Sequence, residues 1–413
     1  MTVTTSSASL TDDAGALAGE LTRLRRTLHG IPEVGLQLPR TQEAVLAALD
    51  GLPLEITTGT GLSSVTGVLR GALPGPTVLL RGDMDALPLA ERSGLDFAAP
   101  VERMHACGHD LHTTMLAGAA RLLSARRDRL AGDVIFMFQP GEEGYDGAGR
   151  MLAEGVLDAA GPGRRPVAAY ALHVMSHSWP AGVFTARGGP QMASSNVLSV
   201  TVRGAGAHGS SPHRGKDPIP PAAEMVGALQ TFVTRSFDVF DPVVLTVGTF
   251  HAGTATNIIP DTARFEATIR CFSAENLERL RAGTVAVCEG IAAAYGVEVE
   301  AVFSEQYPVT VNDRAETDFA AHTVRELLGE ERYAPMDNPS LGAEDFSRVI
   351  EAVPGAMVFL GATPVGADPE TAPSNHSPLA VFDESVLPDG AALYAELALR
   401  RLEAEAGAGT ATV

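Results

Sequence analysis

The sequence predicts an α/β domain that is interrupted by a smaller α+β domain. Apolar, strand-like runs alternate with helical segments in the first part of the chain, and this pattern returns after about residue 306. Between these parts, the strand-like segments alternate polar and apolar residues instead. A chain of 413 residues is also long enough for two or three domains. We therefore expect residues 1–190 and 306–413 to form the larger domain and residues 191–305 to form the insertion.

The larger domain is expected to contain helices packed on a buried sheet. Leucines recur every three or four residues over 14–29, as on one face of a helix, and residues 111–130 predict another helix with Asp110 as its N-cap. Buried strands are expected at the apolar runs 77–80, 133–140 and 166–174. Strands that are apolar along their whole length are typical of a parallel sheet covered by helices on both faces.

The inserted segment predicts a sheet with one open face. Residues 195–204 alternate polar and apolar side chains, so one face of that strand is buried and the other is exposed. Further strands are expected at 243–253 and 263–272, and helices at 220–237 and near 275–294. Two or three such strands with two helices indicate a small α+β domain.

Charge and cysteine content exclude several functional classes. The chain has 30 Lys and Arg against 50 Asp and Glu, and the net charge of −20 disfavours nucleic acid and anionic membranes as partners. Three cysteines are too few for a disulfide framework. Neither a signal peptide nor an apolar run of membrane-spanning length is visible. We therefore expect a cytoplasmic protein.

Residues of the types that bind metals follow the predicted strands. They are Asp83 and Asp85, Cys107 and His109, Glu142 and Glu143, and His173. In an open α/β sheet, sites form beyond the carboxyl ends of the strands. The sequence therefore predicts that these side chains cluster at one edge of the sheet.

The segment HACGHD (105–110) has three interpretations. Cys107 and His109 are separated by one residue, so on an extended loop they point to the same side and could share a metal ion. They could also form a Cys–His nucleophilic pair, although this spacing makes a mutual hydrogen bond awkward. Alternatively, Cys107 is only a small buried residue beside a helix-capping Asp110.

The segment GEEG (141–144) follows a buried strand. The side chains of Glu142 and Glu143 diverge, so one could bind a metal while the other acts as a general base; acids favoured at a helix N-terminus are the alternative. In isolation, His173 in an apolar strand is explained as a hydrogen-bonded core histidine, and His376 in a Pro-flanked loop as an ordinary surface histidine. Taken jointly, the thiol, imidazole and carboxylate donors suit one or two Zn²⁺-like ions with a bridging thiolate.

The inserted domain offers residues that could bind a substrate. A Gly/Ser-rich loop (204–219) holds His208, which could donate to an oxyanion or a carboxylate. Asn257 lies in NIIPD, and Arg270 follows; arginine is the usual partner of a carboxylate. A turn asparagine and a surface cation are the alternatives for these two residues.

Together, these motifs resemble those of the metal-dependent aminoacylase and carboxypeptidase superfamily. The closest resemblance is to its branch of hippurate hydrolases, auxin-conjugate amidohydrolases and N-acyl-amino-acid amidohydrolases. The motifs that carry it are RRTLHGIPEVGLQLPRT (25–41), RGDMDALPL (81–89), HACGHDLHTT (105–114), PGEEG (140–144), LHV (172–174), GAHGSSPH (206–213), KDPI (216–219), TNIIP (256–260), GAEDF (342–346) and NHSP (375–378). They occur in order over nearly the whole chain.

The resemblance implies a di-zinc-peptidase-like α/β catalytic domain with a mixed sheet, interrupted by a lid or dimerisation domain. It implies one or two divalent metal ions per chain, with Zn²⁺ expected first and Mn²⁺, Co²⁺ or Ni²⁺ as alternatives. The implied metal ligands are Cys107, His109, Glu143, His173 and His376. The protein is then expected to form a homodimer or a dimer of dimers.

The resemblance also implies the reaction and its residues. An N-acyl-amino acid would be hydrolysed at its amide bond to a carboxylic acid and a free amino acid, with Glu142 as the general base on a metal-bound water. Asp85 is expected to orient metal ligands. His208 of a neighbouring subunit, Asn257 and Arg270 are expected to hold the carbonyl and carboxylate of the substrate.

Three alternatives remain open at this point. A thiol hydrolase would use Cys107 as its nucleophile and would survive a chelator. A catalytically silent relative would only bind acyl-amino acids, although every residue type needed for catalysis is present. Dipeptidase or carboxypeptidase activity is the alternative within the metal-dependent class.

Overall fold

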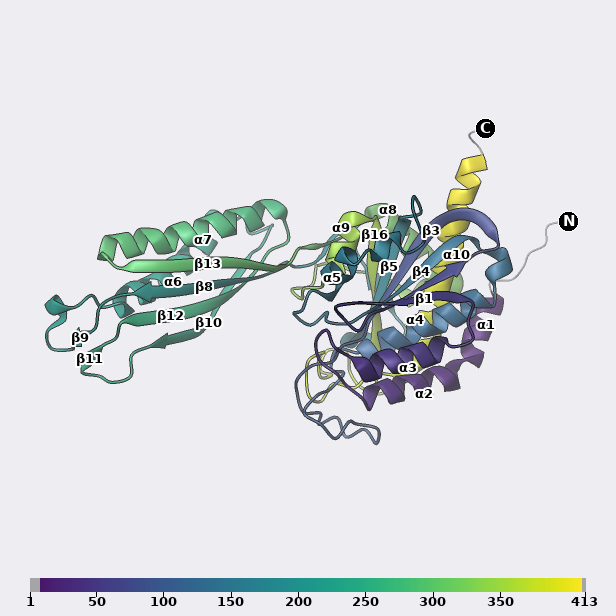
Figure 1. Cartoon of the computed structure of the whole chain (residues 1–413), viewed down its shortest axis with the longest axis horizontal. Helices are drawn as coiled ribbons and strands as arrows, with labels where there is room; N and C mark the ends of the chain where they lie inside the picture. Colours follow the sequence, from purple (N-terminus) through teal and green to yellow (C-terminus); the bar gives the residue numbers. More distant parts are fainter. Residues whose placement is uncertain (1–7, 411–413) are drawn as a thin grey trace. The chain divides into compact units, whose positions relative to one another are not determined.

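The computed structural model describes residues 8–410, and their side chains over residues 10–405. The chain divides into two compact units, which are described separately (Figure 1). The first unit comprises Met1–Gly189, Val311–Asn338 and Arg348–Val413, and the second comprises Pro190–Thr310 and Pro339–Ser347. Residues 306–310 and 339–347, which the sequence alone assigns to the larger domain, thus belong to the second unit.

An eight-stranded mixed sheet forms the centre of the first unit. Its strand order is β1-β2-β4-β3-β5-β16-β6-β15. The bounds are β1 (Leu54–Thr58), β2 (Val65–Arg70), β3 (Leu73–Asp83), β4 (Ala131–Gln139), β5 (Pro166–Pro180), β6 (Phe184–Ala186), β15 (Tyr333–Pro335) and β16 (Gly355–Thr363). The four central strands β4, β3, β5 and β16 run parallel, and antiparallel pairs flank them. The expected α/β class with a mixed sheet is confirmed.

Helices cover this sheet. They are α1 (Ala8–Ala16), α2 (Ala18–His29), α3 (Pro39–Leu49), α4 (His109–Ser124), α5 (Gly147–Ala153), α8 (Arg314–Leu328), α9 (Ser347–Ala352) and α10 (Leu387–Thr410). The helices α4 and α10 pack against each other and against β3, where fully buried Leu80, Leu116 and Leu393 belong to one apolar core. Among the described residues, no helix combines the length and the apolar character that crossing a membrane requires.

The N-terminus of α4 differs from the sequence expectation. The helix starts at His109, so Asp110 lies in its first turn and is not the N-cap. The fully buried carboxylate of Asp110 instead faces α2, where it lies 2.8 Å from both Arg25 Nε and His29 Nδ1. The acid thus anchors α4 to α2. The predicted helix over 14–29 is likewise divided into α1 and α2.

The second unit is a four-stranded antiparallel sheet with two long helices. Its order is β10-β12-β8-β13, with β8 (Ser195–Arg203), β10 (Val244–Ala252), β12 (Thr262–Arg270) and β13 (Glu298–Tyr307). The helices are α6 (Ile219–Ser236) and α7 (Ala274–Tyr295), and a short ribbon pairs β9 (Ala207–His208) with β11 (Ile258–Ile259). Elsewhere in the chain, another short sheet pairs β7 (Gly189–Met192) with β14 (Thr310–Asn312), and it does not belong to the second unit alone. The strand β13 is not predicted from the sequence.

One face of the sheet in the second unit is open, as expected. Along β12, Phe265 and Ile269 are fully buried, whereas the intervening Glu266 and Thr268 are exposed. The buried residues share a core with side chains of α6 and α7, which contact each other (Figure 1). The two helices therefore cover one face and leave the alternate residues of the strands uncovered.

Candidate active site

The loops that follow the central parallel strands lie at one edge of the first unit. In the register of β3 and β4, Asp83 is paired with Gln139, so the segments that carry Asp85 and Glu142 leave the sheet side by side. On the next strand pair, His173 of β5 lies beside Phe359 of β16. The expected gathering of polar residues beyond the strand ends is found for Asp85 and Glu142. His173, expected at the end of its strand, instead lies inside β5, which continues to Pro180.

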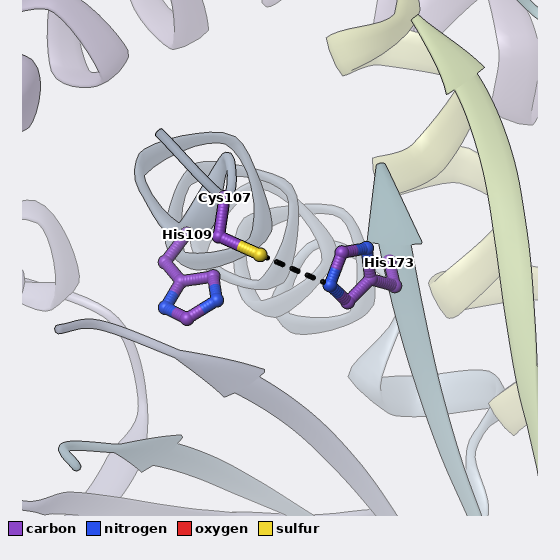
Figure 2. A group of neighbouring side chains, drawn as sticks. All are labelled: Cys107, His109 and His173. Carbon is purple, nitrogen blue, oxygen red and sulfur yellow. Dashed lines mark hydrogen bonds between the residues drawn. The ribbon is translucent and has the colours of Figure 1, made fainter. Parts of the chain in front are cut away.

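Cys107 lies at the centre of two groups of side chains. Its Sγ is 3.4 Å from Nε2 of His173 and 3.3 Å from Nε2 of His376. Figure 2 shows Cys107, His109 and His173 converging, and one atom from each lies within 4.8 Å of the others. Cys107, Glu143 and His376 form a second group by the same measure. The two groups thus share the thiol of Cys107, and their thiol, imidazole and carboxylate donors are of the types that divalent metals bind.

Gly108 allows Cys107 and His109 to face the same site. Its φ of +84° is in the left-handed region, and a Cβ there would lie only 2.3 Å from Cγ2 of Val174. A side chain at this position would therefore be strained and would clash. The conformation of this loop therefore requires a glycine between Cys107 and His109.

Asp85 anchors the turn that carries the two glutamates. Its Oδ1 accepts a hydrogen bond from the backbone N–H of Glu142 (2.9 Å), and its Oδ2 accepts one from the N–H of Glu143 (3.1 Å). Gly141 begins this turn with a φ of +73°. Oδ1 of Asp85 also lies 3.5 Å from Nδ1 of His109. Asp85 therefore fixes the GEEG turn relative to the start of α4.

The two histidines nearest Cys107 have opposite electrostatic environments. Burial, reinforced by the adjacent ring of His112, lowers the pKa of His173 well below its usual range. Its Nδ1 lies 2.9 Å from a backbone carbonyl and donates to it, so the lone pair on Nε2 faces Cys107. By contrast, the close approach of Cys107 and Glu143 raises the pKa of His376 to about 10.

The environment of His109 fits a bound cation. The ring is 1% exposed, and neither of its nitrogens makes a hydrogen bond to any described residue. Burial disfavours its charged form, but Asp83, with Oδ2 at 3.4 Å, and Asp85 raise its pKa well above the usual range. The ring of His109 is thus buried without a hydrogen bond, and the nearby carboxylates stabilise positive charge on it. This environment suits a metal ion in place of the proton.

His112, which the sequence does not predict to be part of the site, lies next to it. Its Nδ1 donates to Oδ1 of Asp83 (2.6 Å), and its Nε2 accepts from the backbone N–H of Val174 (2.7 Å). Arg81 holds the other carboxylate oxygen of Asp83 at 2.8 Å. This buried chain ties the end of β3 and the middle of β5 to α4. The sequence contains one indication of this role. His112 comes three residues after His109, which is about one helical turn further along α4.

In the second unit, the structure brings His208 and Asn257 together. The ribbon of β9 and β11 pairs His208 with Ile258, and the N–H of Gly209 donates to the carbonyl of Asn257 (2.8 Å). The Nδ1 of His208 accepts from the N–H (3.2 Å) and hydroxyl (2.9 Å) of Ser210, and its ring is exposed. His208 thus has an accessible face for a ligand.

Arg270 lies away from that pair. It ends β12, whereas the β9–β11 ribbon precedes the start of the strand at Thr262, and nine strand residues span about 27 Å. The guanidinium of Arg270 forms no ion pair or hydrogen bond with the part of the chain that is described, and burial lowers its pKa. A half-buried arginine without a partner is suited to an incoming carboxylate.

The sequence matches Peptidase family M20/M25/M40 over residues 79–400. Thermostable carboxypeptidase 1 of Saccharolobus solfataricus is 36% identical over 396 residues, which cover 95% of this chain and 98% of that protein. Hippurate hydrolase of Campylobacter jejuni is 34% identical over 392 residues, covering 94% and 98%.

Solved structures agree with this match. A dinuclear metal-binding peptidase of the M20 family from Bacillus subtilis has a TM-score of 0.80 and 32% identity, covering 94% of this chain and 99% of its own. The clustered thiol, imidazole and carboxylate side chains fit a divalent metal. The chain therefore belongs to peptidase family M20/M25/M40 and is a metallo-amidohydrolase.

Proposed function

We propose that this enzyme hydrolyses the amide bond of N-acyl-amino acids. The observation that carries the proposal is the pair of side-chain groups that share Cys107, with Glu142 beside them. The names of the two relatives describe removal of an amino acid that bears a free carboxylate, because hippurate is N-benzoylglycine. The unpartnered Arg270 supplies a group for such a carboxylate.

The proposed metal ligands are Cys107, His109, Glu143, His173 and His376. A bound divalent ion would supply Lewis-acid chemistry at the scissile carbonyl and would acidify water. We propose Zn²⁺ because a thiolate ligand favours it over Mn²⁺, Co²⁺ or Ni²⁺. A thiol that must stay reduced also favours the cytoplasm, and all three cysteines are free and buried.

Glu142 is the proposed general base. Its side chain is 6% exposed, and one of its oxygens lies within 4.8 Å of ligand atoms of both His109 and Glu143. Asp85 fixes its backbone, so the carboxylate is held where it can take a proton from the attacking water. The same carboxylate then passes that proton to the leaving amine.

The placement of His208 and Asn257 supports a homodimer. These residues lie at the opposite end of β12 from Arg270, about 27 Å away by strand length. An N-acyl-amino acid with a small acyl group is much shorter than this distance. We propose that His208 and Asn257 of one subunit hold the substrate carbonyl in the site of its partner, while Arg270 binds the carboxylate.

A substrate panel tests the reaction class. N-acetyl- and N-benzoyl-amino acids should be hydrolysed, and the same compounds with the carboxylate blocked as an amide should be poor substrates. Unblocked dipeptides and longer peptides test carboxypeptidase activity, which the similarity to the Saccharolobus protein makes the second candidate. Rapid cleavage of peptides without cleavage of any acyl-amino acid would contradict the proposal.

A further inference from the structure

Asn375 immediately precedes His376, and both the nitrogen and the oxygen of its side-chain amide form hydrogen bonds. Its Nδ2 donates to the carbonyl oxygens of Val174 (3.0 Å) and Cys107 (3.3 Å), and it lies 3.9 Å from Cys107 Sγ. Its Oδ1 accepts from the backbone N–H (2.9 Å) and the hydroxyl (3.0 Å) of Ser176. One amide thus contacts the two segments that carry Cys107 and His173.

The carbonyl of Val174 links Asn375 to His173. Nδ1 of His173 donates to this carbonyl oxygen (2.9 Å), which also accepts the hydrogen bond from Asn375. The acceptor requires the proton to reside on Nδ1, so the lone pair on Nε2 points toward Cys107. Asn375 therefore fixes the acceptor that sets both the tautomer and the ring orientation of His173.

The backbone of His376 needs such support. Its φ of +68° lies in the left-handed region, which a residue other than glycine adopts only when its surroundings enforce it. The N–H of His376 donates to the carbonyl of Ala106 (2.9 Å), and Asn375 holds the preceding residue of the same loop. Both contacts direct the ring of His376 toward Cys107.

We propose that Asn375 is a positioning residue that arranges Cys107, His173 and His376 for a cation before the cation binds. The inference rests on the proposed ligand set. Its two amide donors hold the carbonyls of Cys107 and Val174, and these contacts fix the backbone of both ligand-bearing segments. Losing a side chain that orients metal ligands typically costs 10- to 100-fold in metal affinity, so we expect a loss of about that size.

Three variants separate this role from simple anchoring of the loop. Asn375→Ala removes all contacts of the amide. Asn375→Asp keeps the acceptor for Ser176 but places an oxygen against the two carbonyls. Ser176→Ala is the matched control, because it removes the hydroxyl shared between Oδ1 of Asn375 (3.0 Å) and the carbonyl of Pro373 (2.8 Å), but it leaves both donors of Asn375 and the backbone N–H of Ser176 in place.

The experiment measures Zn²⁺ affinity of the full-length enzyme by competition with a chromophoric chelator. Co²⁺ replaces Zn²⁺ in a second series, in which the thiolate-to-metal absorption band reports the Cys107 contact. Thermal unfolding of the metal-free proteins is recorded alongside. We expect both Asn375 variants to bind Zn²⁺ about 10- to 100-fold more weakly with a reduced Co²⁺ band, and S176A to retain wild-type affinity.

Other outcomes overturn specific parts of the account. If the wild-type enzyme binds no Zn²⁺, the proposed ligand set is wrong. If it binds Zn²⁺ and both Asn375 variants bind equally well, the inference about Asn375 is wrong, even if their metal-free unfolding temperatures fall. The near-isosteric Asn375→Asp keeps the test decisive should the alanine variant fail to fold.

Discussion

Cys107 and His376 are 269 positions apart in the sequence, yet Cys107 Sγ lies 3.3 Å from His376 Nε2. The two loops that carry them meet only when the parallel strands of the first unit are assembled. Binding of a metal ion by these two proposed ligands would therefore be coupled to folding of that unit, and the bound ion would stabilise the folded state.

Replacing Glu142 by Gln should abolish turnover while metal binding is retained. The amide keeps the shape of the side chain but cannot accept a proton, so we expect kcat to fall by about 10²- to 10⁴-fold. Activity assays with metal analysis of the same sample measure both effects. Substantial remaining activity would show that Glu142 is not the base.

Replacing Asp85 by Asn should weaken metal binding. The carboxylate accepts the N–H groups of both Glu142 and Glu143, and an amide can accept only one of them without turning a donor toward the other. We expect about 10- to 100-fold lower Zn²⁺ affinity by chelator competition. Glu154→Gln is the matched control, because Glu154 also accepts two consecutive backbone N–H groups, away from the site.

Replacing Arg270 by Met should raise KM for acyl-amino acids. Loss of a charge-assisted hydrogen bond to the substrate carboxylate costs about 1.5–3 kcal/mol, which corresponds to a rise of about 10- to 100-fold. Steady-state kinetics measure it, with the exposed Arg264→Met on the same strand as control. An unchanged KM would remove Arg270 from the substrate site.

Mixing two inactive variants tests whether subunits share a site. If His208 acts on the partner's substrate, Glu142→Gln and His208→Ala should complement each other, because a mixed dimer contains one site with both residues intact. Activity of the mixture after subunit exchange should exceed that of either variant alone. No gain, with exchange verified by differently tagged subunits, would contradict sharing.

Stability should fall between about pH 6.5 and pH 9 through His29. Burial opposes charge on this ring, but Asp110 and Glu91 raise its pKa from 6.5 to about 9, against a lowering by Arg25. The buried His105 ring also lies nearby, with a centroid 6.2 Å away. The folded state therefore binds the proton of His29 more tightly than the unfolded state does. The resulting stabilisation of the folded state, about 3 kcal/mol, is complete below pH 6.5 and is lost as pH rises through 9.

Chemical denaturation of the wild type and of His29→Gln at several pH values checks this prediction. The difference in unfolding free energy between the two proteins should be largest at pH 6 and should shrink toward pH 9.5. Other titrating groups are common to both proteins and largely cancel. A difference that does not change with pH would contradict the assignment.

The site loops could be predicted because their donors directly follow strands whose apolar character is evident. Glu142 and Glu143 are examples, because they come three and four residues after the end of β4, and the order of parallel strands brings such loops to one edge. The partners of Asp110 and the role of Asn375 could not be predicted, because they depend on bonds between side chains and distant segments. The edge strand β13 was missed although Val299, Ala301 and Phe303 alternate there, because the intervening residues include exposed acids.

The proposed chemistry depends on a metal ion held by Cys107, His109, Glu143, His173 and His376. The most direct measurement is metal content and activity on an N-acyl-amino acid before chelation, after it, and after metal is restored. The account predicts one or two ions per chain, loss of activity with the metal and recovery with Zn²⁺. Activity that is indifferent to complete removal of the metal would contradict it and would make Cys107 the nucleophile.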